Sequence, residues 1–506
     1  MNKSNLLVIL LTIVLLASCS SADDNLRAMI PDDAVGVVKI DMPALLSKSE
    51  MMKGEAETVV VPDDLKKLID EADPNIISDV VLNLPNSGID FKNNCYVFFS
   101  PGIYKAIALF PISDEDAAET MIAKIASGKM TEKSGVLFAS HLDYGYAIDD
   151  GVLLIGRFMN PVADDVASNA AKGILDKSKP SLFEKEEVSK AIDVKDCDIT
   201  AYIDAKGLTS ILKDHSRFST IFGNIPALEI ITGSGIKAMT ATINFETSKK
   251  DGDSVKILTD FVYDKSSLYS KLYDQVVASA TGGEGVETLN ALPGELDTYF
   301  AIKVNGAKFV EIPQTALLFD WLASSSFTSG VKCKEIISTL NGALAFGVQD
   351  NGGDYNFGVA AQSTSPDMVV AEIVDVANRR GQSPEKNANG EYVYEYNFGE
   401  KAIVMSKTDG VVYLRCVNFA PSYSAGIWPA FVDIMKKSAM VVYKKMIVGN
   451  SHEGHLCWGL RDKSHGEGIY YAENEKENVV ISVLKFLCWK EPNSNFEEDV
   501  EEDYYY

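Results

Sequence analysis

One order of predicted elements occurs twice along this chain, and the repetition limits the folds that it can adopt. Residues 95–112 and residues 343–361 each hold two apolar runs with the composition and spacing of an antiparallel strand pair. A helix is predicted after each pair, because apolar side chains recur there at intervals of three and four residues. Three short strands are predicted after each helix. The sequence therefore predicts two copies of one module.

The final hairpin of each copy has the same predicted turn. Asp150-Gly151 separates the last two strands of the first copy, and Asp409-Gly410 separates those of the second. Asp-Gly is favoured in a type I′ turn, because both central residues of that turn need positive φ. The same turn at the same place in both copies strengthens the prediction of a repeat.

A second kind of module follows each copy, over residues 198–276 and 439–487, and it again combines antiparallel strands with a helix. We therefore expect an α+β fold built from tandem repeated modules of antiparallel sheet with helices packed on one face. The expected organisation is a signal peptide at 1–18, an acidic linker at 19–29, a first α+β half at 30–280, a second α+β half at 290–490 and a disordered acidic tail at 491–506. Repulsion among its acidic side chains is the reason for predicting disorder in the tail.

The amino-terminal residues predict export and lipid attachment. Lys3 precedes an apolar run from Leu6 to Leu16. Such a run rises about 16 Å as a helix, roughly half of a bilayer core, so a signal peptide fits better than a spanning helix. The letters LASC, ending at Cys19, match the bacterial lipobox, in which cleavage exposes a cysteine that receives lipid. The alternative is an ordinary cleavable signal peptide followed by a chance cysteine.

The lipobox, the segment IPDDAVGVVKIDMPALL at 30–46, the length near 500 residues and the tandem modules resemble a Bacteroidota (Bacteroides-type) outer-membrane lipoprotein family catalogued as a domain of unknown function. The resemblance extends from about Asp24 to Leu487. It implies an envelope location and a repeated α+β fold, and it supplies no catalytic residue. Asp23 and Asp24 resemble the surface-export signal of such lipoproteins, and an acidic solvated linker is the open alternative.

The acidic charge of the chain limits the kinds of partner that it can bind. The formal net charge is −25 at pH 7. A protein that binds nucleic acid through phosphates needs a basic surface, so we expect no nucleic-acid partner. The expected partners are the membrane, reached through the amino-terminal lipid, and an envelope protein or glycan of unknown identity.

Several potential metal ligands are grouped near the carboxyl end. His452, His455 and Cys457 lie close together in the sequence, with His465 a few residues further on. Imidazole and thiolate are good zinc or copper ligands. The spacing differs from the H-E-x-x-H pattern that places two imidazoles one helical turn apart. The alternative is a solvated hairpin with Cys457 in the core, and no cofactor is predicted.

No catalytic motif stands out. The sequence has no G-x-S-x-G nucleophile elbow and no P-loop. The leading hypothesis is a non-enzymatic binding or scaffold lipoprotein at the outer membrane, on the cell surface or the periplasmic face. One alternative is a glycan- or peptide-directed hydrolase with an unrecognised carboxylate pair. A second alternative is a metal-handling lipoprotein.

Overall fold

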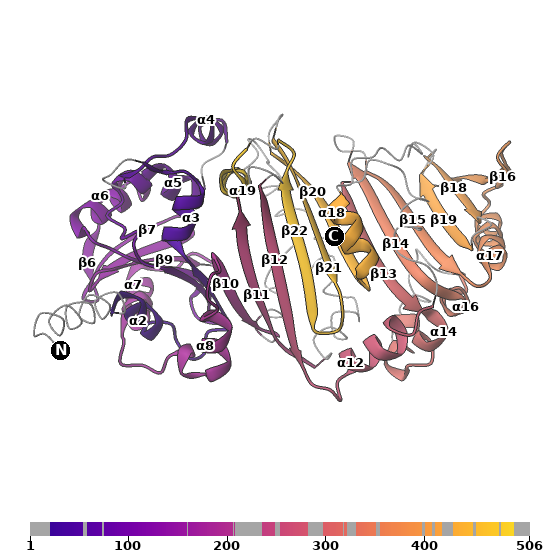
Figure 1. The fold of residues 1–506 in the computed structure, drawn as a ribbon, viewed down its shortest axis with the longest axis horizontal. Coiled ribbons are helices and arrows are strands. Elements are labelled where there is room, and N and C mark those ends of the chain that lie inside the picture. The colour runs from indigo at the N-terminus through magenta and orange to yellow at the C-terminus, as the bar shows by residue number, and fades with distance from the viewer. Residues whose placement is uncertain are drawn as a thin grey trace, which may run out of the picture.

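A computed structural model describes residues 21–53, 58–72, 75–158, 160–205, 207, 235–247, 253–281, 297–316, 318–320, 330–350, 355–396, 400–406, 410–416, 429–448, 452–474 and 477–489. Within these ranges, twenty strands form one antiparallel sheet that runs along the molecule (Figure 1). A separate two-stranded ribbon pairs β2 (Met52–Lys53) with β3 (Thr58–Val59). The chain is therefore an α+β protein with a large antiparallel sheet, as the sequence predicted.

The strands of the amino-terminal part lie side by side in the order β6-β7-β8-β9-β5-β4-β1-β10-β11-β12. Their bounds are β1 (Gly36–Ile40), β4 (Cys95–Phe99), β5 (Tyr104–Pro111), β6 (Thr131–Lys133), β7 (Val136–His141), β8 (Tyr144–Asp149), β9 (Val152–Phe158), β10 (Ile199–Asp204), β11 (Ile236–Glu246) and β12 (Ser254–Tyr263).

The strands of the carboxyl-terminal part lie in the order β22-β21-β20-β13-β14-β15-β19-β18-β17-β16. Their bounds are β13 (Thr298–Asn305), β14 (Leu340–Asp350), β15 (Tyr355–Ser363), β16 (Glu385–Lys386), β17 (Tyr392–Tyr396), β18 (Glu400–Ser406), β19 (Val411–Cys416), β20 (Met440–Val448), β21 (His452–Leu460) and β22 (His465–Ala472).

Strands β12 and β22 join the two parts at the centre of the molecule. They pair antiparallel over seven residue pairs, from Ser254 opposite Tyr471 to Asp260 opposite His465. The link is a strand ladder of main-chain hydrogen bonds, so the two parts share one continuous sheet.

The predicted turns and helices can be compared with the structure directly. Asp150 and Gly151 have φ of 47° and 73°, so the turn between β8 and β9 has the positive φ values that the sequence predicted. Gly410 has φ of 82°, and Asp409 lies outside the described residues. The two predicted helices form as α6 (Glu115–Ile125) and α17 (Pro366–Arg379). Within the described ranges, no helix combines the length and apolar character needed to span a bilayer.

Helices cover both faces of the sheet in the amino-terminal part. Val152 and Leu154 of β9 belong to a core shared with α2 (Ser21–Ala28), α7 (Asp164–Leu175) and α8 (Glu186–Ile192). Leu153 and Ile155, which alternate with them, belong to a core shared with α3 (Met42–Lys48), α5 (Ile76–Asn83) and α6. The expectation of helices on one face was therefore wrong for this part. A strand buried on both faces has a continuous apolar run, and β9 has one.

The expected acidic linker at 19–29 also differs from the structure. Ser21–Ala28 form helix α2, and Leu26 is fully buried in the core of the amino-terminal part. Its acidic residues Asp23 and Asp24 lie in the first helical turn, where they complement the positive end of the helix dipole. The expected signal peptide at 1–18, Cys19 and the expected tail at 491–506 lie outside the described residues.

Helix α19 (Val479–Cys488) lies against both parts of the sheet. Ile481 and Cys488 pack into the core that contains α4 (Asp63–Glu71), α5 and α6. Polar contacts reinforce this packing: Asn75 Nδ2 donates to the carbonyl of Cys488 at 2.7 Å. Lys485 Nζ lies 2.7 Å from Asp64 Oδ2 and also contacts the carboxylate of Glu477.

We expect Lys485→Met to lower the free energy of unfolding by about 3 kcal/mol, because the change removes the ammonium from a largely buried ion pair. The Lys485 and Glu477 side chains expose only 11% and 8% of their surface. Urea unfolding of the purified protein measures the effect. The matched control is Lys437→Met on α18 (Pro429–Lys437), whose exposed pair with Asp433 should contribute less than about 0.5 kcal/mol. Equal losses in both variants would contradict the role of Lys485.

Candidate functional site

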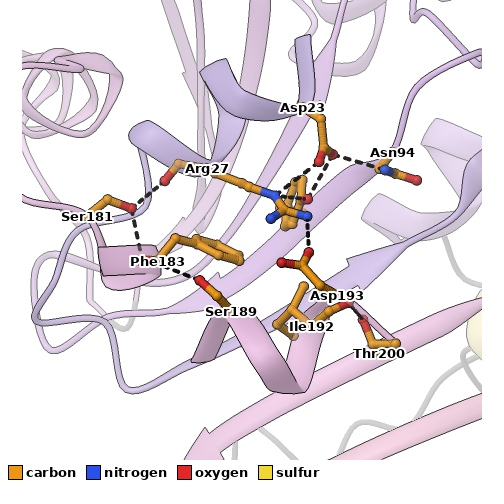
Figure 2. A network of polar contacts seen from close by, with 10 residues as sticks. Asp23, Arg27, Asn94, Ser181, Phe183, Ser189, Ile192, Asp193 and Thr200 are labelled. Carbon is orange, nitrogen blue, oxygen red and sulfur yellow. Dashed lines mark hydrogen bonds and ion pairs between the residues drawn. The ribbon is translucent and has the colours of Figure 1, made fainter. Parts of the chain in front are cut away.

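The two residues of the predicted export signal, Asp23 and Asp24, lie in different environments. Asp23, on α2, accepts a hydrogen bond from Asn94 Nδ2 at 2.9 Å (Figure 2). It accepts a second from Tyr96 Oη at 2.8 Å. Arg27, one turn later on the helix, places Nε 3.0 Å from Asp23 Oδ2. Asp24 is exposed. One member of the acidic pair is thus part of the folded domain, and the other faces solvent.

Arg27 connects α2 to three other segments (Figure 2). Its guanidinium lies 2.6 Å from Asp193 Oδ1 at the end of α8, and it lies over the ring of Phe183 at 4.9 Å from the centroid. Burial alone would lower the pKa of Arg27, but its hydrogen bonds with Asp193 and Tyr96 hold that pKa above the ordinary value. Burial raises the pKa of Tyr96, so the phenol keeps its proton and donates to Asp23. This network fixes α2 against β4 and α8.

We expect Asp23→Ala to lower the free energy of unfolding by about 2 kcal/mol, because three hydrogen-bonding or ionic partners lose a charged acceptor. Asp24→Ala is the matched control, since it is the neighbouring residue with the same charge and should cost less than about 0.5 kcal/mol. Urea unfolding, with hydrogen exchange over α2, checks both. Equal stability of the two variants would show that Asp23 does not hold the helix in place.

A second cluster of polar groups lies on the carboxyl-terminal part, around His455 of β21. The side chain is buried, with 7% exposure. Its Nε2 lies 2.5 Å from Glu473 Oε2, and its Nδ1 lies 2.9 Å from Tyr443 Oη on the neighbouring strand β20. Glu453 lies two residues before His455 on the same strand and therefore on the same face. Each of these three residues offers one ligand atom: Glu453, His455 and Glu473. The three atoms lie within 4.8 Å of one another.

Lys445 and Tyr443 complete this cluster. Lys445 Nζ lies 2.9 Å from Glu453 Oε2. Burial would lower the pKa of Lys445, but the hydrogen bond that Lys445 donates to Glu453 and the charges of Glu453, Asp297 and Glu473 raise it, so the ammonium stays charged. Burial is also the main cause that raises the pKa of Tyr443, and the phenol stays protonated. The cluster thus holds carboxylates, an imidazole, one ammonium and one neutral phenol.

Of the predicted metal ligands whose side chains the structure describes, only His455 belongs to this cluster. Cys457 is fully buried in an apolar core, and burial raises its pKa to about 12, so it remains a thiol. His465 begins β22, where Nδ1 lies 2.9 Å from Asp462. His455 is opposite Tyr471, six residues along β22 from His465, which corresponds to about 20 Å of strand. The side chain of His452 lies outside the described residues.

Two surface hollows lie away from the His455 cluster. A groove of about 400 Å³ runs between α17 and the β16–β17 hairpin. An open hollow of about 740 Å³ lies beside α7 and the β8–β9 turn. In the latter, the hydrogen bond from Lys177 holds the pKa of Asp150 below its usual range, and the hydrogen bond from Ser178 does the same for Asp176. The general acid of a glycosidase needs a raised pKa, so that it keeps its proton at neutral pH.

An apolar row crosses one face of the carboxyl-terminal part. Trp458, Val442, Phe300, Phe346 and Val359 stand opposite one another on the successive strands β21, β20, β13, β14 and β15. Directly opposed residues in antiparallel strands point to the same face of a sheet. Phe346 exposes 40% of its surface and Val442 exposes 37%, which is high for large apolar side chains. We call these five residues the apolar row.

Comparisons with known proteins identify a family but no function. The model of the family described as Domain of unknown function (DUF4836) matches residues 26–371, about two thirds of the chain. No curated protein matches the sequence.

Solved structures of TP0453 show a weak likeness. Crystal form III has 10% identity and a TM-score of 0.27, over 49% of this chain and 86% of that one. Crystal form I has 9% identity and a TM-score of 0.27, over 49% and 82%. Crystal form IV has 11% identity and a TM-score of 0.24, over 46% and 79%. Likeness at these TM-scores supports no conclusion about this chain.

Proposed function

This chain belongs to the family described as Domain of unknown function (DUF4836), and from that premise we propose a function that rests on its own residues. The protein is a non-enzymatic lipoprotein of the cell envelope, anchored to the outer membrane through lipid on Cys19. Its sheet is a scaffold that presents a binding surface to a partner protein. The surface is the apolar row.

The exposure of Phe346 and Val442 within the apolar row, whose other three residues are half-buried, is the observation that carries this proposal. Its five side chains come from five neighbouring strands, so they are held at fixed spacing by the ladder. Contiguous exposed apolar surface with a rigid backbone is typical of protein interaction sites. A glycan site needs directed polar groups beside its aromatic rings. The row itself is apolar, which favours a protein partner over a glycan.

The order of strand pairing supports a tandem duplication of the scaffold. In the amino-terminal part, β5 lies between β4 and β9, and β1 lies between β4 and β10. In the carboxyl-terminal part, β15 lies between β14 and β19, and β13 lies between β14 and β20. Under this proposal β12 and β22 are equivalent strands, and their antiparallel pairing relates the two halves by an approximate twofold axis.

The lipid anchor predicts how the protein partitions between cell fractions. We expect the native protein in the membrane fraction and Cys19→Ala in the soluble fraction, because lipid on Cys19 is the proposed attachment. Cys333→Ala is a control cysteine change that should leave the protein in the membrane fraction. Protease treatment of intact cells then separates the cell surface from the periplasmic face. Retention of Cys19→Ala on membranes would contradict the anchor.

A photo-crosslinking amino acid placed at Phe346 tests the binding surface. We expect it to form one adduct of defined mass with an envelope protein in intact cells. Val442→Thr in the same chain should reduce the adduct several-fold, because it interrupts the row with a residue that still suits a strand.

The matched control is the same crosslinker at Lys256, an exposed position of β12. Lys256 is aligned through Ile469 with Cys457, so it lies on the opposite face of the sheet from Trp458. Adducts of equal yield at both positions would show non-specific contact. The absence of any protein adduct at Phe346 would contradict a protein partner.

A further inference from the structure

We propose that Glu453, His455 and Glu473 form a binding site for a divalent transition-metal ion of the size of Zn²⁺. The site goes beyond the proposed scaffold function, and neither depends on the other. Imidazole nitrogen and carboxylate oxygen are ordinary zinc ligands, with bonds of about 2.0–2.2 Å. The three residues supply one nitrogen and two carboxylates, which leaves a fourth position for water.

The backbone brings these residues together. Glu453 and His455 are two residues apart on β21, so both project from the same face. The chain beyond β22 returns Glu473 beside them, and the Glu473 amide donates to the Glu453 carbonyl at 2.9 Å. The ligand positions are therefore set by strand pairing, and Glu473 adds a side chain from just beyond the end of the hairpin.

The distances fit a metal ion after a small adjustment. The three ligand atoms lie within 4.8 Å of one another, whereas two ligands of one tetrahedral zinc lie about 3.4 Å apart. His455 Nε2 and Glu473 Oε2, now 2.5 Å apart, must separate by about 1 Å. Rotation of the Glu473 side chain, which is 57% exposed, is sufficient for this.

The local charge favours a divalent cation. Lys445 is the cation beside Asp297, Glu453 and Glu473: its Nζ lies 2.9 Å from Glu453 Oε2, and its amide donates to the Asp297 carbonyl at 2.7 Å. Counted as formal charges without the histidine, the three carboxylates and one ammonium sum to −2. A divalent ion balances that charge, and partial burial of the site strengthens its attraction.

Tyr443 orients the imidazole for metal binding. Its hydroxyl lies 2.9 Å from His455 Nδ1, and its ring packs against Phe431 of α18 at 5.7 Å between centroids. When Nδ1 keeps its proton and donates to Tyr443, Nε2 presents its lone pair to the ion. A hydrogen bond of this kind to the non-ligating nitrogen is a regular feature of histidine metal sites. Tyr443 is thus a positioning residue.

A zinc titration of the purified full-length protein in detergent tests the site. After chelation and removal of metal, isothermal calorimetry with ZnCl₂ at pH 7 should give one ion per chain. We expect His455→Gln and Glu473→Gln each to weaken zinc binding at least 100-fold, because each removes a ligand. Tyr443→Phe should weaken it about tenfold, the lower end of the range for lost orienting hydrogen bonds.

His465→Gln is the matched control. That histidine also lies beside carboxylates, Asp462 and Asp260, but belongs to a separate contact. It should leave the affinity unchanged. The proposal is overturned if less than one ion binds at saturating zinc, or if His455→Gln binds zinc as well as the native protein does.

Thermal unfolding with and without zinc keeps the test valid if a variant is destabilised. Zinc should raise the Tm of the native protein and of His465→Gln, because a ligand that binds the folded state stabilises it. It should leave the Tm of Glu453→Gln nearly unchanged. The Glu453 side chain is 37% exposed, so this variant is expected to fold even if His455→Gln does not. An equal rise in Tm for Glu453→Gln and the native protein would also overturn the proposal.

Discussion

The antiparallel pairing of β12 with β22 is the interaction on which the rest of the structure depends. It turns two strand arrays into one sheet, and helix α19 reinforces it by packing on cores from both parts. Without this ladder, each part would expose a long edge strand, and exposed edges invite pairing with other chains. The described sheet instead ends in β6 and β16, with three and two residues. Such short edges offer little template for pairing with other chains. The central pairing, which covers the long edges of β12 and β22, therefore also protects the protein from edge-to-edge aggregation.

Local pattern was sufficient to predict the elements that have strong periodicity. The strand pairs near 95–111 and 340–363, helices α6 and α17, and the turn at Asp150 all follow from spacing or turn chemistry. Helix α7 was missed because its buried positions Ala167, Ser168 and Ala171 are small and give a weak apolar signal. Helix α2 was predicted to be a linker because its acidic residues indicate a solvated segment, and Leu26 alone gives only a weak apolar signal. The β12–β22 pairing could not be predicted, since each strand would suit many partners.

The His455 cluster shows how sequence proximity and spatial proximity diverge in a sheet. His455 was found because several ligand-type residues occur near it in the sequence. Cys457 does share its face, yet it lies in an apolar core that keeps the thiol protonated. Glu473 was missed because it is eighteen residues away and reaches His455 only through the register of the β21–β22 hairpin. Strand register depends on long-range pairing, so a search for short sequence motifs cannot detect it.

The clamped helix α2 has a consequence for the proposed lipid anchor. Only Ser20 separates Cys19 from the first residue of α2, and two peptide steps span about 7 Å. Because Asp23 and Arg27 fix α2 to the folded domain, the tether cannot act as a long flexible linker. Lipid on Cys19 would therefore hold the amino-terminal part close to the bilayer. Helix α2 lies toward one end of the sheet, while β13, β14 and β15, which carry three residues of the apolar row, lie toward the other (Figure 1). A rigid sheet between them would set the distance from the membrane at which a partner is bound.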